Sequence, residues 1–271
     1  MKKHPVLGYT GVAYNAQGHV VGVKGVGKDT AATIVSNLYG DTHRIVHTSF
    51  ALKLKRIVSE YYNLNTDVCD IPRHKELGLV QYPGWSWRKL LEIYGTDVVR
   101  NGLRKRLPKL RTDEIWLNEV RYDILTSRMT PQEKLVMDTF DLSSYEFFDH
   151  PRHEIIPRLG YSLHELSHAM HDTMEEHKLP SPVRATPFAI QVTDVRFLNE
   201  YTMLKQHGAS IIQIRRMVPD QTISTHISNR MDPAMIPDIV IENNEDVEAL
   251  ERRIEDQIGM LFYQDVKSTQ Q

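Results

Sequence analysis

The sequence predicts an α/β fold in three layers, with a parallel sheet covered by helices on both faces. Short runs rich in β-branched residues alternate with longer segments whose apolar residues recur at helical spacing. A glycine-rich segment, GVKGVGKDT at residues 22–30, joins a predicted strand to a predicted helix. Alternation of strands and helices favours parallel strands joined by helical crossovers, which produces the three layers.

The first half of the chain begins with two predicted strands within residues 6–23, separated by a polar turn at Asn15 to Gly18. Apolar residues at helical spacing then predict a helix from Lys28 to Tyr39. Ser86 is the expected N-cap of a later helix, because a serine hydroxyl can accept a hydrogen bond from the first turn. The other predicted elements of this half are a strand over residues 44–50 and helices over 51–62 and 87–94.

Regular alternation returns at residue 188, after a segment of different composition. Residues 121–187 are polar, interrupted by prolines and rich in histidine. We therefore expect residues 1–120 and 188–271 to form one core, and residues 121–187 to be a mostly helical insertion that serves as a lid or as an oligomer contact in a homodimer. The predicted elements of the second half are strands over 188–195, 209–216 and 238–244 and helices over 197–208 and 246–262, the last with Asn244 as its N-cap.

The composition does not indicate a nucleic-acid-binding or membrane protein. The 271 residues carry a formal net charge of only -2, and no run of about 18 apolar residues could span a bilayer. The first residues lack the uninterrupted apolar segment of a signal peptide. The single cysteine, Cys69, cannot form an internal disulfide and suits a reducing compartment. We expect a cytoplasmic protein that binds neither nucleic acid nor membrane.

The segment at residues 22–30 nearly matches the phosphate-binding pattern G-x-x-x-x-G-K-[ST]. Gly22, Gly27 and Lys28 fit, but Asp29 stands where a Mg²⁺-binding hydroxyl is expected, and Thr30 comes one position late. A glycine-rich turn into an ordinary helix is the alternative, but the lysine, the spacing and the strand–helix context together favour nucleotide binding. The predicted phosphate-binding residues are Gly22, Val23, Lys24, Gly25, Val26, Gly27, Lys28, Asp29 and Thr30.

The G-K-D-T ending of this segment resembles the loop of phage deoxynucleoside monophosphate kinases, which belong to the P-loop kinase group. Three further stretches are similar to segments of that family and occur in the same order. They are WSWRKLLEIYGTDVVRNG at residues 85–102, TDVRFLNEYTMLKQHGASIIQIRR at 193–216 and THISNRMDPAMIPDIVIENNEDVEALERRI at 225–254. The long insertion and Glu92, where relatives often carry Gln, depart from the family pattern.

The resemblance implies a fold of the P-loop kinase type and transfer of the γ-phosphate of ATP, with Mg²⁺, to a deoxynucleoside monophosphate (dNMP). It also implies a phage enzyme of deoxyribonucleotide metabolism that acts in the host cytoplasm. The residues to which it assigns catalysis are Lys28, Arg88, Arg100, Asp194 and Arg196, and those to which it assigns metal contact are Asp29, Thr30 and Asp194. The implied acceptor site contains Lys55, Arg88, Gly95, Thr96, Asp97, Arg100, Trp116, Arg196 and Glu200, with Glu200 orienting Arg196. Asn243 and Asn244 would flank the adenine of ATP.

Simpler interpretations of these residues remain open. Lys55 and Arg88 can be solvated helix charges, Arg196 and Glu200 an ordinary i,i+4 surface pair, and Trp116 a core residue. The six basic residues between 100 and 111 form either a solvated helix face or a segment that closes over the transferring phosphate. Two other activities share the loop, namely a kinase of the dephospho-coenzyme A type and a nucleotide-binding module without catalysis.

The predicted insertion contains a possible metal motif, HELSHAMH at residues 164–171. H-E-x-x-H is the pattern of zinc metalloproteases, in which two histidines share one helix face and the glutamate is the base. The extended pattern fails, because His171 and Met174 stand where a glycine and a third histidine are required. We interpret the segment as an amphipathic helix in a lid or at a dimer contact, with an incidental surface metal site as an alternative.

Overall fold

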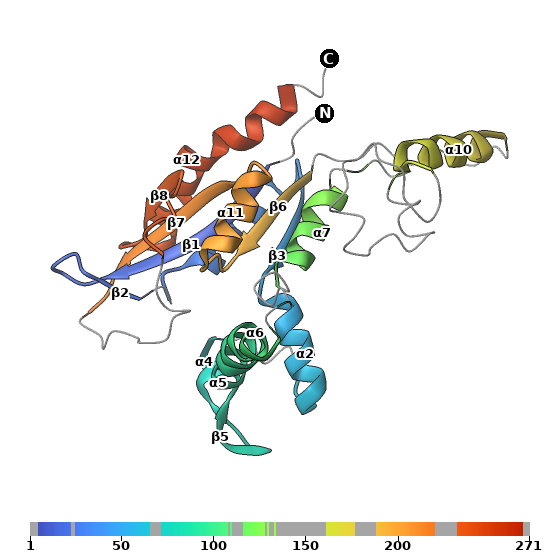
Figure 1. The fold of residues 1–271 in the computed structure, drawn as a ribbon. Coiled ribbons are helices and arrows are strands. Elements are labelled where there is room, and N and C mark those ends of the chain that lie inside the picture. Colours follow the sequence, from blue (N-terminus) through green and yellow to red (C-terminus); the bar gives the residue numbers. More distant parts are fainter. Residues whose placement is uncertain are drawn as a thin grey trace.

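The computed structural model describes residues 5–22, 25–65, 72–107, 116–127, 161–176, 188–219 and 232–267, together with the single positions 109, 129 and 133. A mostly parallel sheet lies at the centre, in the strand order β3-β6-β1-β7-β8, and β2 pairs with β1 in the antiparallel direction (Figure 1). The parallel sheet predicted from the sequence is confirmed. Its strands are β1 (Val6–Tyr14), β2 (Val20–Gly22), β3 (Arg44–Ser49), β6 (Phe188–Thr193), β7 (Ser210–Met217) and β8 (Ile239–Glu242).

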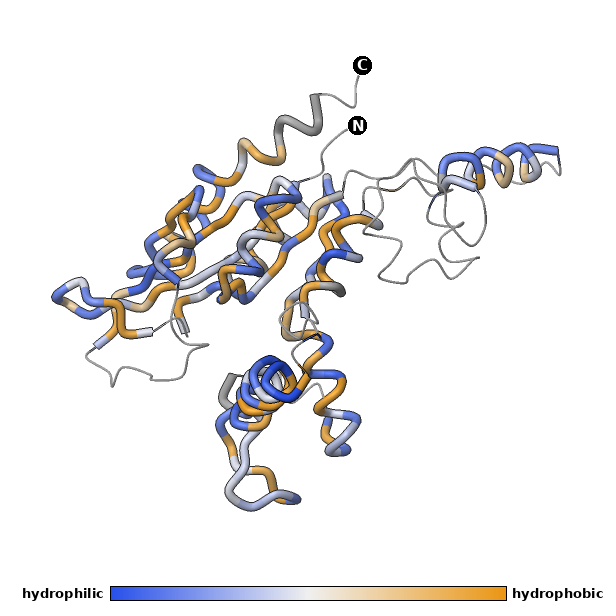
Figure 2. Tube along the Cα trace, viewed as in Figure 1, coloured by the Kyte–Doolittle hydropathy of each residue, from blue (hydrophilic) through white to orange (hydrophobic). Residues whose placement is uncertain are grey.

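Helices cover both faces of the sheet. The helices α1 (Lys28–Tyr39) and α12 (Val247–Lys267) pack on one face, and α7 (Leu117–Ser127) and α11 (Leu198–Gln206) pack on the other. Alternate residues of β1 supply the two cores, since Leu7 and Tyr9 join the α1–α12 side and Val6 joins the α7–α11 side. Figure 2 shows hydrophobic residues along the strands, while hydrophilic residues alternate with them along the covering helices.

A smaller helical module lies below the sheet in Figure 1. It has its own small core, in which Val58, Trp87 and Leu90 are buried. The Ser86 hydroxyl accepts a hydrogen bond from the Lys89 N–H at 3.3 Å, so the predicted N-cap is confirmed. The module consists of α2 (Leu52–Tyr62), α4 (Pro72–Glu76), β4 (Gly78–Leu79), β5 (Tyr82–Ser86), α5 (Trp87–Glu92), the π-helix η1 (Ile93–Leu103) and α6 (Arg104–Arg106).

Two boundaries differ from those expected. The predicted start of the insertion at residue 121 falls inside α7, whose Val120 and Ile124 are fully buried against the sheet. The N-cap of α12 is Asp246 and not Asn244, because the Asp246 carboxylate accepts the Ala249 N–H at 2.8 Å. The one described helix of the remaining insertion is α10 (Leu163–Glu176), which lies apart from the sheet (Figure 1). Within the described ranges, no helix is long and apolar enough to cross a membrane.

Candidate functional site

The order of the strands creates a crevice between β1 and β6. The chain leaves β1 through α1 toward β3 on one side of the sheet, and leaves β6 through α11 toward β7 on the other side of β1. The two crossovers therefore diverge between these neighbouring parallel strands. In open α/β sheets, ligands bind outside the carboxyl ends of the strands at such a switch point. The glycine-rich segment and Asp194 both follow strands that end there.

The glycine-rich segment turns sharply into α1, which begins at Lys28 as predicted. Gly25 and Gly27 have φ angles of 67° and 97°, a conformation that favours glycine. A Cβ atom at Gly27 would lie 2.4 Å from the Asn243 side chain, whose Nδ2 donates to the Val26 carbonyl at 2.8 Å. Since Gly27 is also the N-cap, it has no side chain to accept from the first turn of α1, an arrangement suited to anion binding. Val23 and Lys24 lie outside the described residues.

The glycine that permits close packing of this segment is Gly11, not Gly22. A Cβ atom at Gly11 would lie 2.4 Å from Cγ2 of Val26 and 3.2 Å from Cδ of Lys28, whereas a Cβ atom at Gly22 would meet no described residue within 4 Å. The β1–β2 hairpin lies between the two glycines in the chain and returns Gly22 to a position beside Ala13. The sequence pattern placed Gly22 at the first glycine of the loop by its spacing from Gly27 and Lys28. The sequence signal for Gly11 is a glycine inside the predicted strand before the hairpin, a position where another part of the backbone often approaches closely.

Three charged residues meet at the crevice. Nζ of Lys28 lies 3.5 Å from Oδ1 of Asp194, and Nη2 of Arg196 lies 3.2 Å from the same oxygen. Asp194 has a φ angle of 65°, which is uncommon for a residue other than glycine and is often found at functional sites. Although burial disfavours its charged form, Arg196 and Lys28 hold the pKa of the Asp194 carboxyl below its usual range. Burial lowers the pKa of Lys28, and Asp194 opposes this shift.

Glu200 organises the neighbouring wall of the crevice. Its side chain is buried, and its Oε2 accepts the backbone N–H groups of Arg196 at 2.8 Å and Phe197 at 3.1 Å. Its Oε1 lies 3.4 Å from Nη2 of Arg100, whose guanidinium stacks 3.7 Å from the centre of the Phe197 ring. Burial raises the pKa of Glu200, and Arg100 opposes this shift. The resemblance implied that Glu200 orients Arg196. It holds the backbone of Arg196, but the guanidinium that it pairs with is that of Arg100.

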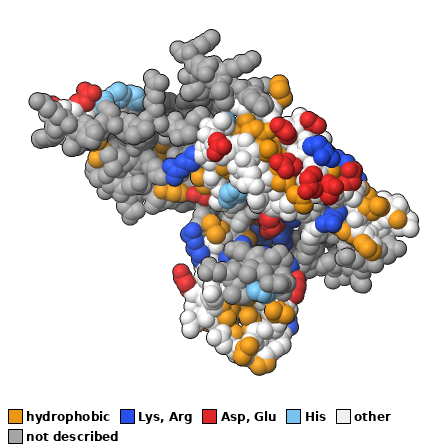
Figure 3. All heavy atoms as spheres, turned by 180° about the vertical axis from the view of Figure 1, so that it is seen from behind, with side chains coloured by type: hydrophobic (Ala, Val, Ile, Leu, Met, Phe, Trp, Pro, Cys, Tyr) orange, Lys and Arg blue, Asp and Glu red, His pale blue; other side chains and the backbone are white. Residues whose placement is uncertain are grey.

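A cavity of about 120 Å³ opens between the carboxyl edge of the sheet and the helical module. One water needs only about 10–15 Å³ of such volume, so this cavity is not a packing defect. Lys and Arg side chains gather where the sheet meets the module (Figure 3). The cavity is lined by Phe50, Ala51, Leu54, Lys55, Lys75, Arg88, Leu91, Glu92, Gly95, Thr96, Arg100, Trp116, Asp194, Arg196, Phe197 and Glu200. Five of these side chains are basic and three are acidic, so the cavity has a cationic lining.

The cavity is lined by most of the predicted acceptor-site residues. Two of the predicted residues, Asp97 and Trp116, differ from expectation. Asp97 is exposed and does not line the cavity. Trp116 is buried, and its Nε1 donates to the Gly95 carbonyl at 3.4 Å, so its side chain both packs in the core and borders the cavity. Sequence reasoning missed Lys75 and Phe197. Lys75 lies on α4, a short helix that no motif marked.

The remaining predicted residues lie around this cavity. Asp29 and Thr30 are exposed on the first turn of α1, next to Lys28. Arg88 contacts Glu76 within the helical module. Of the basic residues between 100 and 111, Arg100 alone lines the cavity, and Arg111 lies outside the described residues. The exposed members of that set are Arg104, Lys105, Arg106 and Lys109.

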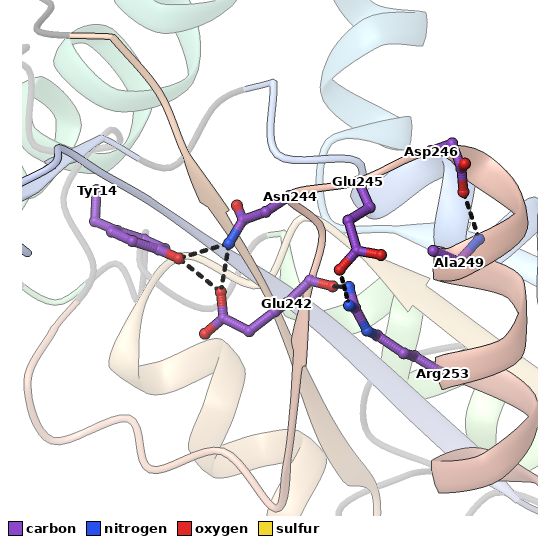
Figure 4. Close-up of polar contacts among 7 residues, drawn as sticks. All are labelled: Tyr14, Glu242, Asn244, Glu245, Asp246, Ala249 and Arg253. Carbon is purple, nitrogen blue, oxygen red and sulfur yellow. Dashed lines mark hydrogen bonds and ion pairs between the residues drawn. The ribbon is translucent and has the colours of Figure 1, made fainter.

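A second polar network ties the end of β8 to the β1–β2 hairpin (Figure 4). Nδ2 of Asn244 lies 2.8 Å from the hydroxyl oxygen of Tyr14, and that hydroxyl donates to Oε2 of Glu242 at 2.8 Å. Arg253 donates to the Glu242 carbonyl at 2.7 Å and so fixes α12 to the same strand end. The resemblance placed Asn243 and Asn244 beside adenine. In the structure, Asn243 hydrogen-bonds the glycine-rich segment at Val26, and Asn244 hydrogen-bonds Tyr14 at the end of β1.

The glutamate of the H-E-x-x-H segment is engaged in a helix cap. Glu165, which would be the base, accepts from the backbone N–H of Ser162 at 2.8 Å and from the Ser162 hydroxyl at 2.7 Å. The Ser162 hydroxyl in turn accepts the Glu165 N–H at 3.2 Å, so the two residues form a capping box at the start of α10. Among the residues that the structure describes, no three potential metal ligands cluster together.

Comparison of the chain with protein-family models and with curated proteins found no match in either case.

Proposed function

We propose that this protein is a P-loop type kinase that transfers the γ-phosphate of ATP to the phosphate of a dNMP. The observation that carries the proposal is the meeting of Lys28, Asp194 and Arg196 at the strand switch point, beside a cavity with a cationic lining. Phosphate groups of two nucleotides would meet there, one at the N-terminus of α1 and the other in the cavity. The four stretches that resemble phage dNMP kinases supply most of the residues involved.

The proposed chemistry needs charge and position more than it needs a base. The acceptor phosphate is already a nucleophile at neutral pH, so no group has to remove a proton from it. The difficulty is that two polyanions must approach each other, and cationic side chains held in place reduce that cost. Lys28 would contact the donor phosphates, and Arg88, Arg100 and Arg196 would contact the acceptor and the transferring group.

The residues around Lys28 fit a Mg²⁺ ion, which prefers oxygen ligands. The Asp194 side chain is 29% exposed, and its low pKa keeps it ionised at neutral pH. Asp29 and Thr30 offer further oxygen atoms on the exposed first turn of α1. When bound, Mg²⁺ would neutralise charge on the donor phosphates.

Two other functions share the loop. A kinase of the dephospho-coenzyme A type would use another acceptor. A nucleotide-binding module would bind ATP at the loop and would not need basic side chains that converge on an adjacent acceptor cavity. The convergence of Arg88, Arg100 and Arg196 on one cavity favours a kinase over a binding module. We further propose a cytoplasmic location, which suits an enzyme of nucleotide pools.

An assay of ATP consumption with different acceptors tests the proposed acceptor class. The purified chain is incubated with ATP, Mg²⁺ and each of the four dNMPs, their ribose counterparts or dephospho-coenzyme A. We expect turnover with one or more dNMPs and little with the ribose forms. Turnover with dephospho-coenzyme A alone would move the protein to the first alternative. ATP binding without turnover of any acceptor would favour the binding module.

A further inference from the structure

Two histidines of α10 lie side by side on an exposed face, away from the nucleotide site. The Nε2 atoms of His164 and His168 are 3.2 Å apart, and the centres of their rings are 4.3 Å apart. The residues are one helical turn apart, and both are exposed to solvent. Histidine side chains are visible on the surface at the end of the molecule that α10 occupies (Figure 3).

This separation suits two nitrogen ligands of one metal ion. Zinc binds histidine nitrogen at about 2.0–2.1 Å, so two nitrogens at a tetrahedral angle are about 3.3 Å apart. The 3.2 Å between the two Nε2 atoms is close to that value. In the absence of metal the same distance allows a hydrogen bond between the rings, with one nitrogen donating to the other. An ion that replaced this hydrogen bond would need little movement of either ring.

We propose that His164 and His168 form a chelating site for one divalent transition-metal ion per chain, such as Zn²⁺, Ni²⁺ or Cu²⁺. Imidazole nitrogen suits these ions, whereas Mg²⁺ and Ca²⁺ select oxygen ligands. With two protein ligands the ion keeps open positions for water, so the site binds reversibly and a chelator removes the ion. Glu165 takes no part, because it holds the capping box with Ser162.

The same helix offers a matched control. His171 lies one turn further along and is 41% exposed, but its Nε2 pairs with Oε1 of Glu175 at 3.4 Å and not with another histidine. The variant His171→Ala therefore removes a partly exposed histidine from α10 and leaves the proposed pair intact. The chain contains 13 histidines in total, so the difference between variants is the measurement that matters.

The test is titration of the full chain with Ni²⁺, Zn²⁺ or Cu²⁺, with the binding heat measured by calorimetry. We expect one site per chain in the wild type, and an affinity about a hundredfold lower in His164→Ala and in His168→Ala, because each variant loses the gain from two linked ligands. His171→Ala should bind within about twofold of the wild type, and Mg²⁺ should not compete. Helix content by circular dichroism checks that the variants fold.

A spectroscopic measurement provides an independent outcome. The electron paramagnetic resonance spectrum of bound Cu²⁺ should show two coupled nitrogens in the wild type and one in each single variant of the pair. Equal affinity in the wild type and in His164→Ala, or an equal loss in His171→Ala, would overturn the proposed site. These measurements need no kinase activity, so they stand or fall separately from the proposed function.

Discussion

The two walls of the cavity hold their charges in different ways. On the sheet wall, Asp194, Arg196 and Glu200 follow β6 directly, and their side chains pair with Lys28, with each other or with Arg100. On the wall formed by the helical module, Lys55, Lys75 and Arg88 come from three separate helices. The contact of Arg88 is with Glu76, whose side chain is 58% exposed.

This difference indicates on which wall the positions of the charged side chains have to be fixed. Glu200 on the sheet wall and the adjoining Lys28 are buried, and a buried charge is costly unless it is paired and hydrogen-bonded, so this side requires a fixed backbone and matched partners. Charges near solvent bear a smaller cost and can adjust to a ligand. We expect changes in the sheet wall to reduce turnover and stability strongly, and changes in the module wall mainly to weaken binding of the acceptor.

The largest expected effect is that of Lys28→Ala on phosphate transfer. Removal of the buried ammonium at the N-terminus of α1 should lower kcat by about a thousandfold, because its charge would act on the phosphates in the transition state. Steady-state ATP consumption with a dNMP acceptor measures this. Lys53→Ala, an exposed lysine on α2, is the control and should keep the wild-type rate. Wild-type turnover by Lys28→Ala would remove the loop from the mechanism.

A pair of glutamate variants compares the stability of the two walls. Glu200→Ala removes one acceptor of Arg100 and the acceptor of two backbone N–H groups, and should lower the free energy of unfolding by about 3 kcal/mol. Glu76→Ala breaks an exposed pair with Arg88 and should cost less than about 1 kcal/mol. Unfolding in urea measures both. Equal costs would show that the two walls do not differ as described.

A pair of glycine variants tests which glycine the loop requires. Gly11→Ala places a Cβ atom against Val26 and Lys28 and should cost about 1–3 kcal/mol of stability, with a loss of turnover because Lys28 is displaced. Gly22→Ala meets no described residue within 4 Å and should stay within about 0.5 kcal/mol of the wild type. Urea unfolding and kcat are measured for both variants. The reverse order would restore Gly22 as the essential glycine.

A smaller effect is expected from Arg88→Ala in the module wall. Loss of this guanidinium, whose partner Glu76 is exposed, should raise KM for the dNMP by about tenfold, equivalent to about 1.4 kcal/mol, and should leave kcat within about twofold. Initial rates at varied dNMP and fixed ATP give both constants. A fall in kcat as large as that of Lys28→Ala would place Arg88 in the same class as the sheet-wall residues.

The smallest expected effect is the pH dependence of the stability that Asp194 contributes. Its pKa is depressed in the folded state, so its contribution to stability is present above the ordinary aspartate pKa of about 3.9 and is lost as the pH falls through the folded value. The difference in unfolding free energy between the wild type and Asp194→Asn should therefore shrink below about pH 4. Asp97→Asn, at an exposed carboxylate that does not line the cavity, is the matched control. A difference that stays constant with pH would contradict the charge pairing.

Much of the fold could be predicted from the sequence, because it depends on local patterns. The apolar spacing of α1 predicts both of its ends, and Ser86 could be identified as a cap because a serine hydroxyl before a helix can accept a hydrogen bond from the first turn. The N-cap of α12 was misplaced by two residues, since Asn244, Glu245 and Asp246 offer several polar side chains in a row. The side chain of Asn244 instead contacts Tyr14, far away in the chain.

The site was less predictable, because it depends on contacts between distant segments. The importance of Gly11 comes from its packing against Val26 and Lys28 across the hairpin, which no spacing rule describes. Lys75 enters the cavity only because the helical module folds back beneath the sheet. The preference of Glu200 for the Arg100 guanidinium likewise depends on the position of η1 relative to α11.

The most direct test of the proposed transfer is to follow the γ-phosphate itself. The chain is incubated with ATP labelled at the γ-phosphate, Mg²⁺ and a mixture of the four dNMPs, and the labelled products are separated. Label in a deoxynucleoside diphosphate, absent with Lys28→Ala, is the result that the proposal predicts. Label released only as inorganic phosphate, or retained entirely in ATP, would contradict phosphate transfer between nucleotides at this site.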